Sequence, residues 1–428
     1  MAKAKSPPAV APGDAPAPRI GRRELLGGAL GAAAGSFLPR RTSAEERPIS
    51  TGEPPQRPGT QGRGPTPLGE RSPFEQPRRG VGSAAPNGSS TTPLQDLHGI
   101  ITPSDLHFER HHAGVPEVDP TRYALLIHGR VERPLRFTLD DLKRFPARSR
   151  LYFIECSGNG YRGYGRLAMR ETLTPQQIDG LTSTSEWIGV PLATLLRETG
   201  VKANAEWFLA ESMDAALMKR SIPLAKAWED ALVAYGQNGE ALRPEQGYPV
   251  RLVLPGWEGN AQVKWLRRIE ISDGPFMTRE ETSRYTDPLA DCTARIFSFK
   301  MDAKSIITFP AHPVRLGEPG WWEITGLAWS GRGLVTRVDV STDGGASWAE
   351  AALQQPVLPK CHTRFRYLWR WRGEEAVLMS RAVDETGYVQ PTREALVAAR
   401  GAGTVYHTNN IRAWRVRADG RVFFATGA

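Results

Sequence analysis

Apolar and polar positions after residue 90 predict two regions of different structure, and the first of them mixes helices and strands. The apolar runs Arg122–Val131, Arg150–Cys156 and Tyr248–Gly256 predict strands, and the second is continuous enough to predict burial on both faces. Phe137–Pro146 predicts a short helix that ends at proline. Pro191–Gly200 predicts another helix, with Pro at its start and Gly at its end.

The pattern changes from about Thr293, where short alternating runs are separated by Gly, Asp and Asn. Asp343-Gly344-Gly345 is typical of a hairpin turn, and we find no helical stretch in this region. Strands at this spacing predict a β-sandwich of about 100 or more residues. We therefore predict an α+β fold with a mixed α+β domain over residues 91–290 and an all-β domain over 291–428.

The first 90 residues have a different character. Paired Arg22-Arg23 precede an apolar run, Leu25–Leu38, that is too short to span a membrane, and small residues follow at Thr42–Ala44. This pattern predicts a twin-arginine export signal over residues 1–44, hence a periplasmic protein without a membrane span. Residues 45–90 are rich in Pro, Gly, Ser and Arg and predict a disordered linker or an extended wrap.

Charge excludes one class of partner. The formal net charge is +9, but residues 1–90 hold 13 Lys and Arg against 7 Asp and Glu, so the folded part is close to neutral. A nucleic-acid-binding protein needs a basic face on its folded part. We therefore expect no nucleic-acid partner.

Candidate chemistry begins at Cys156, one of three cysteines, which ends a predicted strand and opens a glycine-rich turn. Gly158 and Gly160 allow the backbone to approach a bulky group closely, and Asn159 tolerates a left-handed turn. Three interpretations are open: a small buried hydrophobe, a nucleophile paired with an upstream histidine, or a thiolate ligand of a soft metal. Zinc is disfavoured, because no cysteine or histidine pair has zinc-ligand spacing.

Two further clusters favour a cofactor site. The polar loop His107–Pro116 contains an arginine and two adjacent histidines, and Gly247–Trp265 presents Arg251 and Lys264 at the two ends of a strand–turn–strand segment. Arg and Lys gathered around one site suit an anionic cofactor that carries a phosphate.

Taken together, these stretches resemble the sulfite oxidase family of molybdenum-cofactor enzymes, over roughly Thr91 to the C-terminus. The motifs occur in the family's order, and each is weak alone. They are Phe108-Glu109-Arg110-His111-His112 with Val115-Pro116, Cys156-Ser157-Gly158-Asn159, Trp187-Ile188-Gly189-Val190, Ser221–Leu224, Gly247–Arg251 with Pro255-Gly256 and Val263-Lys264-Trp265, Gly326–Gly331, and Asp343–Trp348.

The resemblance implies a molybdenum–molybdopterin cofactor with Cys156 as the protein's thiolate ligand to the metal. Arg110, Trp187 and Tyr285 would be the catalytic residues that line the substrate pocket. The second domain would be an immunoglobulin-like dimerisation domain. The residues implied to bind the cofactor are His111, His112, Asp214, Gln246, Arg251, Val263 and Lys264.

Departures from the family pattern narrow the expected substrate. Gly160-Tyr161 separates Arg162 from the cysteine motif, Gln246 replaces a histidine, and Tyr406 and His407 stand where an arginine is expected. Fewer cations suit a larger and less charged sulfur substrate than sulfite. Within the family, Pro93–Pro116 is most similar to the molybdenum subunits of sulfane dehydrogenases, which implies a sulfane sulfur held on the cysteine of a sulfur-carrier protein.

The electron acceptor is expected to be a separate protein. The chain contains no CxxCH motif and no iron–sulfur cysteine set, so we expect no haem in it and a c-type cytochrome subunit as partner. The resemblance implies a homodimer or a heterotetramer. Two alternatives stay open: a sulfite dehydrogenase of the same fold, and a non-catalytic secreted β-sandwich that binds partners.

Overall fold

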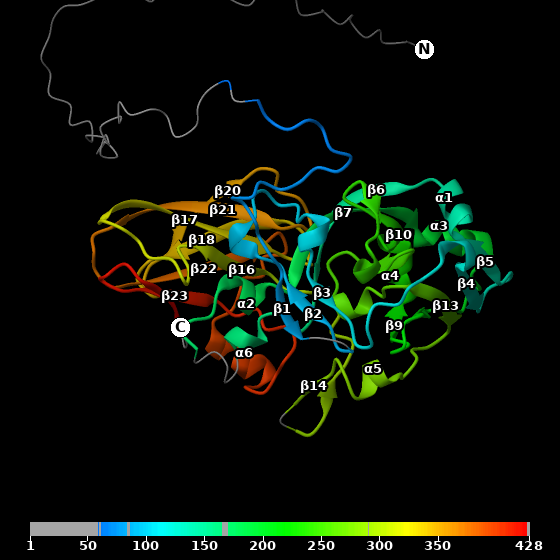
Figure 1. Ribbon diagram of the computed structural model, residues 1–428. Coiled ribbons are helices and arrows are strands. Elements are labelled where there is room, and N and C mark those ends of the chain that lie inside the picture. Colours follow the sequence, from blue (N-terminus) through cyan, green and yellow to red (C-terminus); the bar gives the residue numbers. More distant parts are fainter. Residues whose placement is uncertain (1–58, 60, 84–85, 165–169, 290, 426–428) are drawn as a thin grey trace, which may run out of the picture. The chain divides into compact units, whose positions relative to one another are not determined.

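A computed structural model describes residues 59, 61–83, 86–164, 170–289 and 291–425 (Figure 1). Arg71–Ala428 forms one compact unit, and Met1–Glu70 is a separate one. The export signal predicted over residues 1–44 lies outside the described residues. No helix in the described part of the chain is long and apolar enough to cross a membrane.

The first domain contains two sheets, and the larger core lies beside a sheet that is antiparallel except for its β4–β13 pair. α1 (Leu139–Arg144) begins with a capping box between Thr138 and Asp141. α3 (Leu192–Thr199) ends at Gly200, and α4 covers Leu224–Glu229. The strands of this sheet, in order, are β5 (Leu135–Thr138), β4 (Ala124–Gly129), β13 (Leu266–Ser272), β8 (Trp207–Ser212) and β9 (Lys219–Pro223).

The second sheet carries the cysteine. β6 (Arg148–Glu155) ends one residue before Cys156, and its last three residues are buried. Within the apolar run, Arg150 is exposed and Leu151 and Tyr152 are partly buried, so the expected burial holds only from Phe153 to Glu155. The order of this sheet is β11 (Glu240–Ala241), β10 (Leu232–Gln237), β7 (Thr182–Pro191) and β6, with β12 (Arg251–Val253) also paired to β10.

The second domain is sheet-rich, as predicted, and its core draws on both of its sheets. The helix α6 (Arg393–Arg400), capped by Thr392, corrects the expectation that the region contains no helix. It was missed although Thr392 and Gly401 mark its two ends, because it has only eight residues and strand-like runs flank it. The first sheet is β16 (Lys304–Phe309), β17 (Gly320–Trp329), β21 (Thr363–Trp371) and β20 (Ala352–Gln354); the second is β19 (Ala349–Glu350), β18 (Val335–Ser341), β22 (Ala376–Asp384), β23 (Arg412–Val416) and β24 (Val422–Ala425).

Smaller elements border these sheets. β1 (Gly80–Ser83), β2 (Ser89–Thr91) and β3 (Glu109–Arg110) form a three-stranded sheet. Residues 80–83 are therefore ordered, which fits the extended wrap, one of the two alternatives expected over 45–90, and not the disordered linker. Backbone hydrogen bonds to β2 and the Arg79 contacts with Glu109 and Glu245 hold the segment. The other elements are α2 (Pro175–Asp179), α5 (Arg279–Thr282), and a hairpin of β14 (Asp287–Pro288) and β15 (Ala294–Arg295).

Two glycines meet where the domains join. Gly256 has φ +78°, and a Cβ built on it would lie 2.1 Å from the Gly331 carbonyl oxygen. A Cβ on Gly331 would lie 2.0 Å from the Gly256 carbonyl oxygen. The Met301 amide donates to the Gly256 carbonyl at 3.0 Å, and the Gly331 amide to the Met301 carbonyl at 2.8 Å. Only glycine fits at either position.

Candidate functional site

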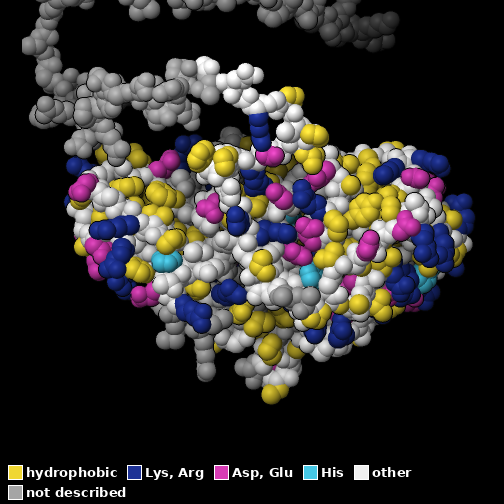
Figure 2. Space-filling view, viewed as in Figure 1, with side chains coloured by type: hydrophobic (Ala, Val, Ile, Leu, Met, Phe, Trp, Pro, Cys, Tyr) yellow, Lys and Arg dark blue, Asp and Glu magenta, His cyan; other side chains and the backbone are white. Residues whose placement is uncertain are grey.

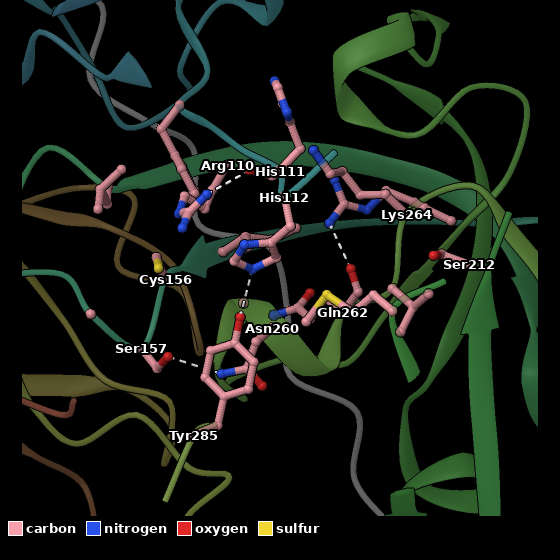
Figure 3. Close-up of a pocket in the computed structure, with 18 of the residues that line it drawn as sticks. Arg110, His111, His112, Cys156, Ser157, Ser212, Asn260, Gln262, Lys264 and Tyr285 are labelled. Atoms are coloured by element: carbon pink, nitrogen blue, oxygen red, sulfur yellow. Dashed lines mark hydrogen bonds between the residues drawn. The ribbon is translucent and has the colours of Figure 1, made fainter. Parts of the chain in front are cut away.

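A cavity of about 320 Å³ lies at the end of β6 and collects side chains from segments far apart in the sequence (Figure 3). The loop before β3, the turn after β6, the segment after β8 and the strand–turn–strand around β12 all contribute to its wall. Residues predicted from the sequence that line it are Arg110, His111, His112, Cys156, Asp214, Gln246, Arg251, Val263, Lys264 and Tyr285.

Cys156 borders this cavity on a tight turn, Cys156–Gly160, which we call the cysteine turn. The amide of Cys156 donates to the Leu181 carbonyl at 3.0 Å, and the Asn159 amide donates back to the Cys156 carbonyl at 2.9 Å. The left-handed residue of this turn is Gly160, with φ +90°, and Asn159, which would tolerate that conformation, does not adopt it. Burial raises the pKa of the Cys156 thiol, and the nearby Arg110 guanidinium opposes this shift.

The charged side chains of the cavity are unbalanced. Four of the lining side chains are cations, Arg110, Arg251, Lys264 and Arg284, and Asp214 is the one carboxylate among the described lining residues. Arg251 is 2% exposed, and its terminal nitrogens donate to the Gln246 and Gln262 carbonyls at 3.0 and 3.2 Å. Its Nε finds no hydrogen-bond partner within the described residues. A buried guanidinium in this state is strongly disfavoured without an anion.

Lys264 is in a similar environment. Its Nζ donates to the Glu245 carbonyl at 2.8 Å and lies 4.5 Å from the centre of the Trp265 ring. Burial, together with the charge of Arg251, lowers the pKa of Lys264 to about 7. Burial lowers the pKa of Arg251 to about 9. An anionic ligand between the two cations would reverse both shifts, because it stabilises their charged forms.

A tyrosine–histidine pair faces the cysteine side of the cavity (Figure 3). The Tyr285 hydroxyl and His112 Nε2 are 2.9 Å apart. Burial lowers the pKa of His112 to about 4, and burial also raises the pKa of Tyr285. At neutral pH the neutral imidazole therefore accepts a hydrogen bond from the phenol. The Tyr285 ring packs between Arg220, at 5.3 Å, and Tyr406, at 5.5 Å.

The side chains of two predicted cofactor-binding residues are occupied by protein partners. His111 Nδ1 accepts from the Gly88 amide at 3.2 Å, and Nε2 is 2.8 Å from Glu109 Oε1. Gln246 Nε2 donates to the Phe108 carbonyl at 2.9 Å. These two residues border the cavity and fix its wall.

Trp187 does not line the cavity, which corrects the expectation that it forms part of the substrate pocket. Its side chain is fully buried, and its Nε1 donates to the Tyr152 carbonyl at 3.2 Å. The Arg251 guanidinium lies 4.9 Å from the indole centre, so Trp187 supports Arg251 from behind the cavity wall. Arg162 is also absent from the described lining, and its neighbour Tyr161 is present.

Sequence reasoning missed several lining residues. Arg284 is exposed and lines the cavity beside Tyr285. Asn260 donates to the Ser157 hydroxyl at 2.9 Å, which ties the cysteine turn to the segment after β12 (Figure 3). The only indication in the sequence that Arg284 lines the cavity was its position next to Tyr285. Nothing local to Asn260 indicates that it contacts the cysteine turn.

Comparison with known families identifies both domains. Residues 112–280 match the oxidoreductase molybdopterin binding domain, and residues 295–413 match the Mo-co oxidoreductase dimerisation domain. The chain therefore belongs to the sulfite oxidase family of molybdenum-cofactor oxidoreductases.

Among solved structures, the chain is similar to the sulfane dehydrogenase SoxCD from Paracoccus pantotrophus. The TM-score is 0.83 and the identity 45%, and the match covers 87% of this chain and 98% of that chain. It is 31% identical to mitochondrial sulfite oxidase from Mus musculus, over 74% of this chain and 62% of the relative. It is 32% identical to NADH nitrate reductase from Solanum lycopersicum, over 71% of this chain and 38% of the relative. The chain thus spans less than two thirds of these curated relatives.

The cavity fits the molybdopterin cofactor of this family. The unpaired Nε of Arg251 and the depressed pKa values of Arg251 and Lys264 indicate a place for an anion such as the pterin phosphate. Within the described residues, no group of three or more His, Cys, Asp or Glu side chains could hold a metal ion. Cys156 supplies the one thiol among the described lining residues.

Proposed function

We propose that this chain is a molybdenum-dependent oxidoreductase that oxidises sulfur compounds. More narrowly, its substrate would be a sulfane sulfur on the cysteine of a carrier protein, and its electrons would pass to a c-type cytochrome in the periplasm. The observation that carries the proposal is the cavity itself, in which the Cys156 thiol borders a set of cations with one carboxylate among its described lining. The similarity to SoxCD supports the choice of substrate.

In this proposal, Arg251 and Lys264 hold the phosphate of the cofactor, and Cys156 binds its metal. When bound, the cofactor supplies the two-electron chemistry that transfers oxygen to sulfur. Arg110 and Arg284 attract and orient an anionic sulfur group by charge. Tyr285 presents a phenol whose single O–H can donate either to His112 Nε2 or to that sulfur group.

The partners follow from the same relatives. The dimerisation domain match supports an oligomer, either a homodimer or a heterotetramer. Export by the twin-arginine route would place the chain in the periplasm with its cofactor already bound. Figure 2 shows that Lys and Arg side chains are interspersed with Asp and Glu over the face drawn, which suits protein partners better than nucleic acid.

Free sulfite is the second candidate substrate, because Arg110 and Arg284 both line the cavity and could bind a small dianion. Turnover with sulfite should be compared with turnover on a carrier protein that bears a sulfane sulfur, using an added cytochrome c as acceptor. A higher kcat/KM for the carrier supports the narrow proposal. A higher kcat/KM for sulfite supports a sulfite dehydrogenase.

The broader proposal is tested by metal analysis. The protein purified from a host that makes the cofactor should contain about one molybdenum per chain. In Cys156→Ser, X-ray absorption should lose one sulfur neighbour of the metal and turnover should fall at least about a hundredfold, because the hydroxyl is a poor ligand for a soft site. The matched control is Cys292→Ser, an exposed cysteine outside the cavity. Absence of molybdenum from active protein would contradict the proposal.

A further inference from the structure

The residue before Cys156 is a fully buried carboxylate whose contacts reach into the second domain. Glu155 Oε1 accepts from Lys304 Nζ at 2.6 Å and from Asn159 Nδ2 at 2.9 Å. Glu155 Oε2 accepts from Trp329 Nε1 at 2.7 Å. Lys304 begins β16 and Trp329 ends β17, so both donors outside the cysteine turn belong to the second domain.

The backbone of the cysteine turn is held from the same side. The Asn159 carbonyl accepts from Lys304 Nζ at 3.2 Å and from the Thr408 hydroxyl at 3.0 Å. The Gly160 carbonyl accepts from an Arg412 guanidinium nitrogen at 3.1 Å. Both carbonyls at the end of the turn are therefore fixed by side chains of the second domain.

Burial strengthens these hydrogen bonds and shields them from water. Glu155, Lys304, Trp329 and Arg412 are each at most 2% exposed, so water does not compete for their donors and acceptors. Hydrogen bonds to a charged group are stronger than neutral ones, and removing one donor leaves a buried acceptor partly unsatisfied. The carboxylate thus has a single low-energy position, which also fixes the adjacent Cys156 backbone.

We propose that the second domain positions the Cys156 thiol, with Glu155 as the residue through which it acts. Glu155, Lys304, Trp329 and Thr408 are positioning residues, and none of them lines the described cavity. The assignment of the thiol to a metal rests on the proposed function. The positioning itself does not, because every contact above joins two groups of the chain.

The test compares two buried tryptophans in cofactor-free protein. Trp329→Phe removes the donor to Glu155 and keeps an aromatic ring, whereas Trp414→Phe changes an equally buried indole whose Nε1 has no partner among the described residues. Hydrogen exchange is read from a peptide that covers the cysteine turn. We expect its amides to exchange on the order of tenfold faster in Trp329→Phe than in Trp414→Phe. Equal exchange in the two variants overturns the proposal.

A second pair of variants guards against a misfolded tryptophan mutant. Thr408→Val removes the hydroxyl donor to Asn159 with little change in volume. Thr363→Val is the control, because Thr363 is as deeply buried and its hydroxyl has no partner in the part of the chain that the structure describes. Faster exchange of the cysteine turn in Thr408→Val alone supports the proposal. Indistinguishable exchange in the two threonine variants overturns it.

The same variants, loaded with cofactor, separate this inference from the proposed function. If both hold, Trp329→Phe retains less molybdenum per chain than Trp414→Phe and changes the electron paramagnetic resonance signal of the partly reduced metal. If the exchange result holds and neither protein contains molybdenum, the positioning stands and the proposed function fails. A Trp329→Phe protein with unchanged metal content and unchanged signal overturns the claim that positioning acts on the thiol.

Discussion

The role of individual residues in the cavity follows from their charge more than from their shape. Burial and the nearby charge of Arg251 lower the pKa of Lys264, burial lowers the pKa of Arg251, and both side chains donate chiefly to backbone carbonyls. Carbonyl dipoles solvate a cation without neutralising it. The site is therefore electrostatically incomplete until an anion enters, which is the property expected of a phosphate-binding site.

Lys264 gives this argument a measurable pH dependence. Its pKa falls from 10.5 to about 7 in the folded chain, so between these values the unfolded state binds a proton that the folded state does not. Unfolding then takes up a proton, and the free energy of unfolding of cofactor-free protein rises as pH increases from about 7 to 10. Lys264→Met should abolish this part of the rise, as measured by urea denaturation across the pH range.

Other groups titrate in the same range, so the control is Lys202→Met, which changes an exposed lysine. Its pH profile should parallel that of the wild type. A Lys264→Met profile that also parallels the wild type would show that Lys264 is charged in the empty cavity. Loading the wild type with cofactor should flatten the rise, because the phosphate keeps Lys264 protonated in the folded state.

The sequence predicted that a residue lines the cavity most reliably where that residue belongs to a continuous family motif. Cys156, Arg251 and Lys264 each stand in such a motif, and all three border the cavity. Trp187 also stands in a motif but lies behind the wall, because sequence order does not reveal which face of β7 meets the cavity. Contacts such as Glu155 with Lys304 join positions 149 residues apart and leave no local signature.

At the scale of elements, the cysteine turn shows why one glycine is required and another is not. Gly160 has φ +90°, and a Cβ there would lie 2.3 Å from an Arg412 nitrogen and 2.6 Å from Asp179 Oδ1. Around Gly158, the nearest atom to such a Cβ is the Val405 carbonyl oxygen at 3.6 Å. The sequence presents the two glycines as equivalent, and the packing distinguishes them.

Gly160→Ala should therefore destabilise the protein by at least about 2 kcal/mol, from backbone strain and from displacement of the Arg412–Asp179 pair. Gly158→Ala is the matched substitution in the same turn and should leave the melting temperature within about 2 °C of the wild type. Thermal unfolding followed by circular dichroism compares the two. Equal melting temperatures for the variants would mean that the turn adjusts to a side chain at Gly160.

Boundary signals led to the prediction of α1 and α3, but α2 and α6 were missed although they also have capping residues. Thr138 and Asp141 cap α1, and Gly200 ends α3, as the sequence indicated. Two of the elements that were missed, β1 and α6, are short. β1 has four residues and pairs with β2, and α6 has eight residues between strand-like runs, so neither stood out in the pattern of apolar positions.

For the whole molecule, buried ion pairs link the two domains. Arg412 Nε donates to Asp179 Oδ2 at 3.0 Å, and Lys304 lies within 3.5 Å of the same carboxylate. Arg412 and Lys304 hold the pKa of Asp179 below its usual value against the opposing effect of burial. If the domains separated, these charged side chains would lose their partners while still incompletely solvated, which is unfavourable. The two domains should therefore unfold together.

We expect denaturant unfolding of Arg71–Ala428 to be one transition that coincides for tryptophan fluorescence and circular dichroism. Arg412→Met should lower the free energy of unfolding by about 3–5 kcal/mol, because it leaves Asp179 buried with one cationic partner. Arg421→Met, which breaks an exposed ion pair with Asp419, should leave the midpoint unchanged. Two separate transitions in the wild type would contradict this coupling.

The sequence predicted a mixed domain followed by a sheet-rich one because their apolar periods differ. It did not predict how closely the two are joined, since the junction is built from polar side chains and from backbone. The family motifs indicated which residues surround the cavity, and the structure adds that Glu155, the residue before the cysteine, accepts hydrogen bonds from across the junction.

The contact between Gly256 and Gly331 also limits which substitutions this protein can accept during evolution. Each glycine occupies the space that any side chain on the other would need, so neither position can drift alone. A chimera in which one domain is replaced by that of a distant homologue will fold only when both domains have glycine at these two positions. In a library of such chimeras, the presence of both glycines should therefore predict which proteins fold better than the overall sequence identity of the parents does.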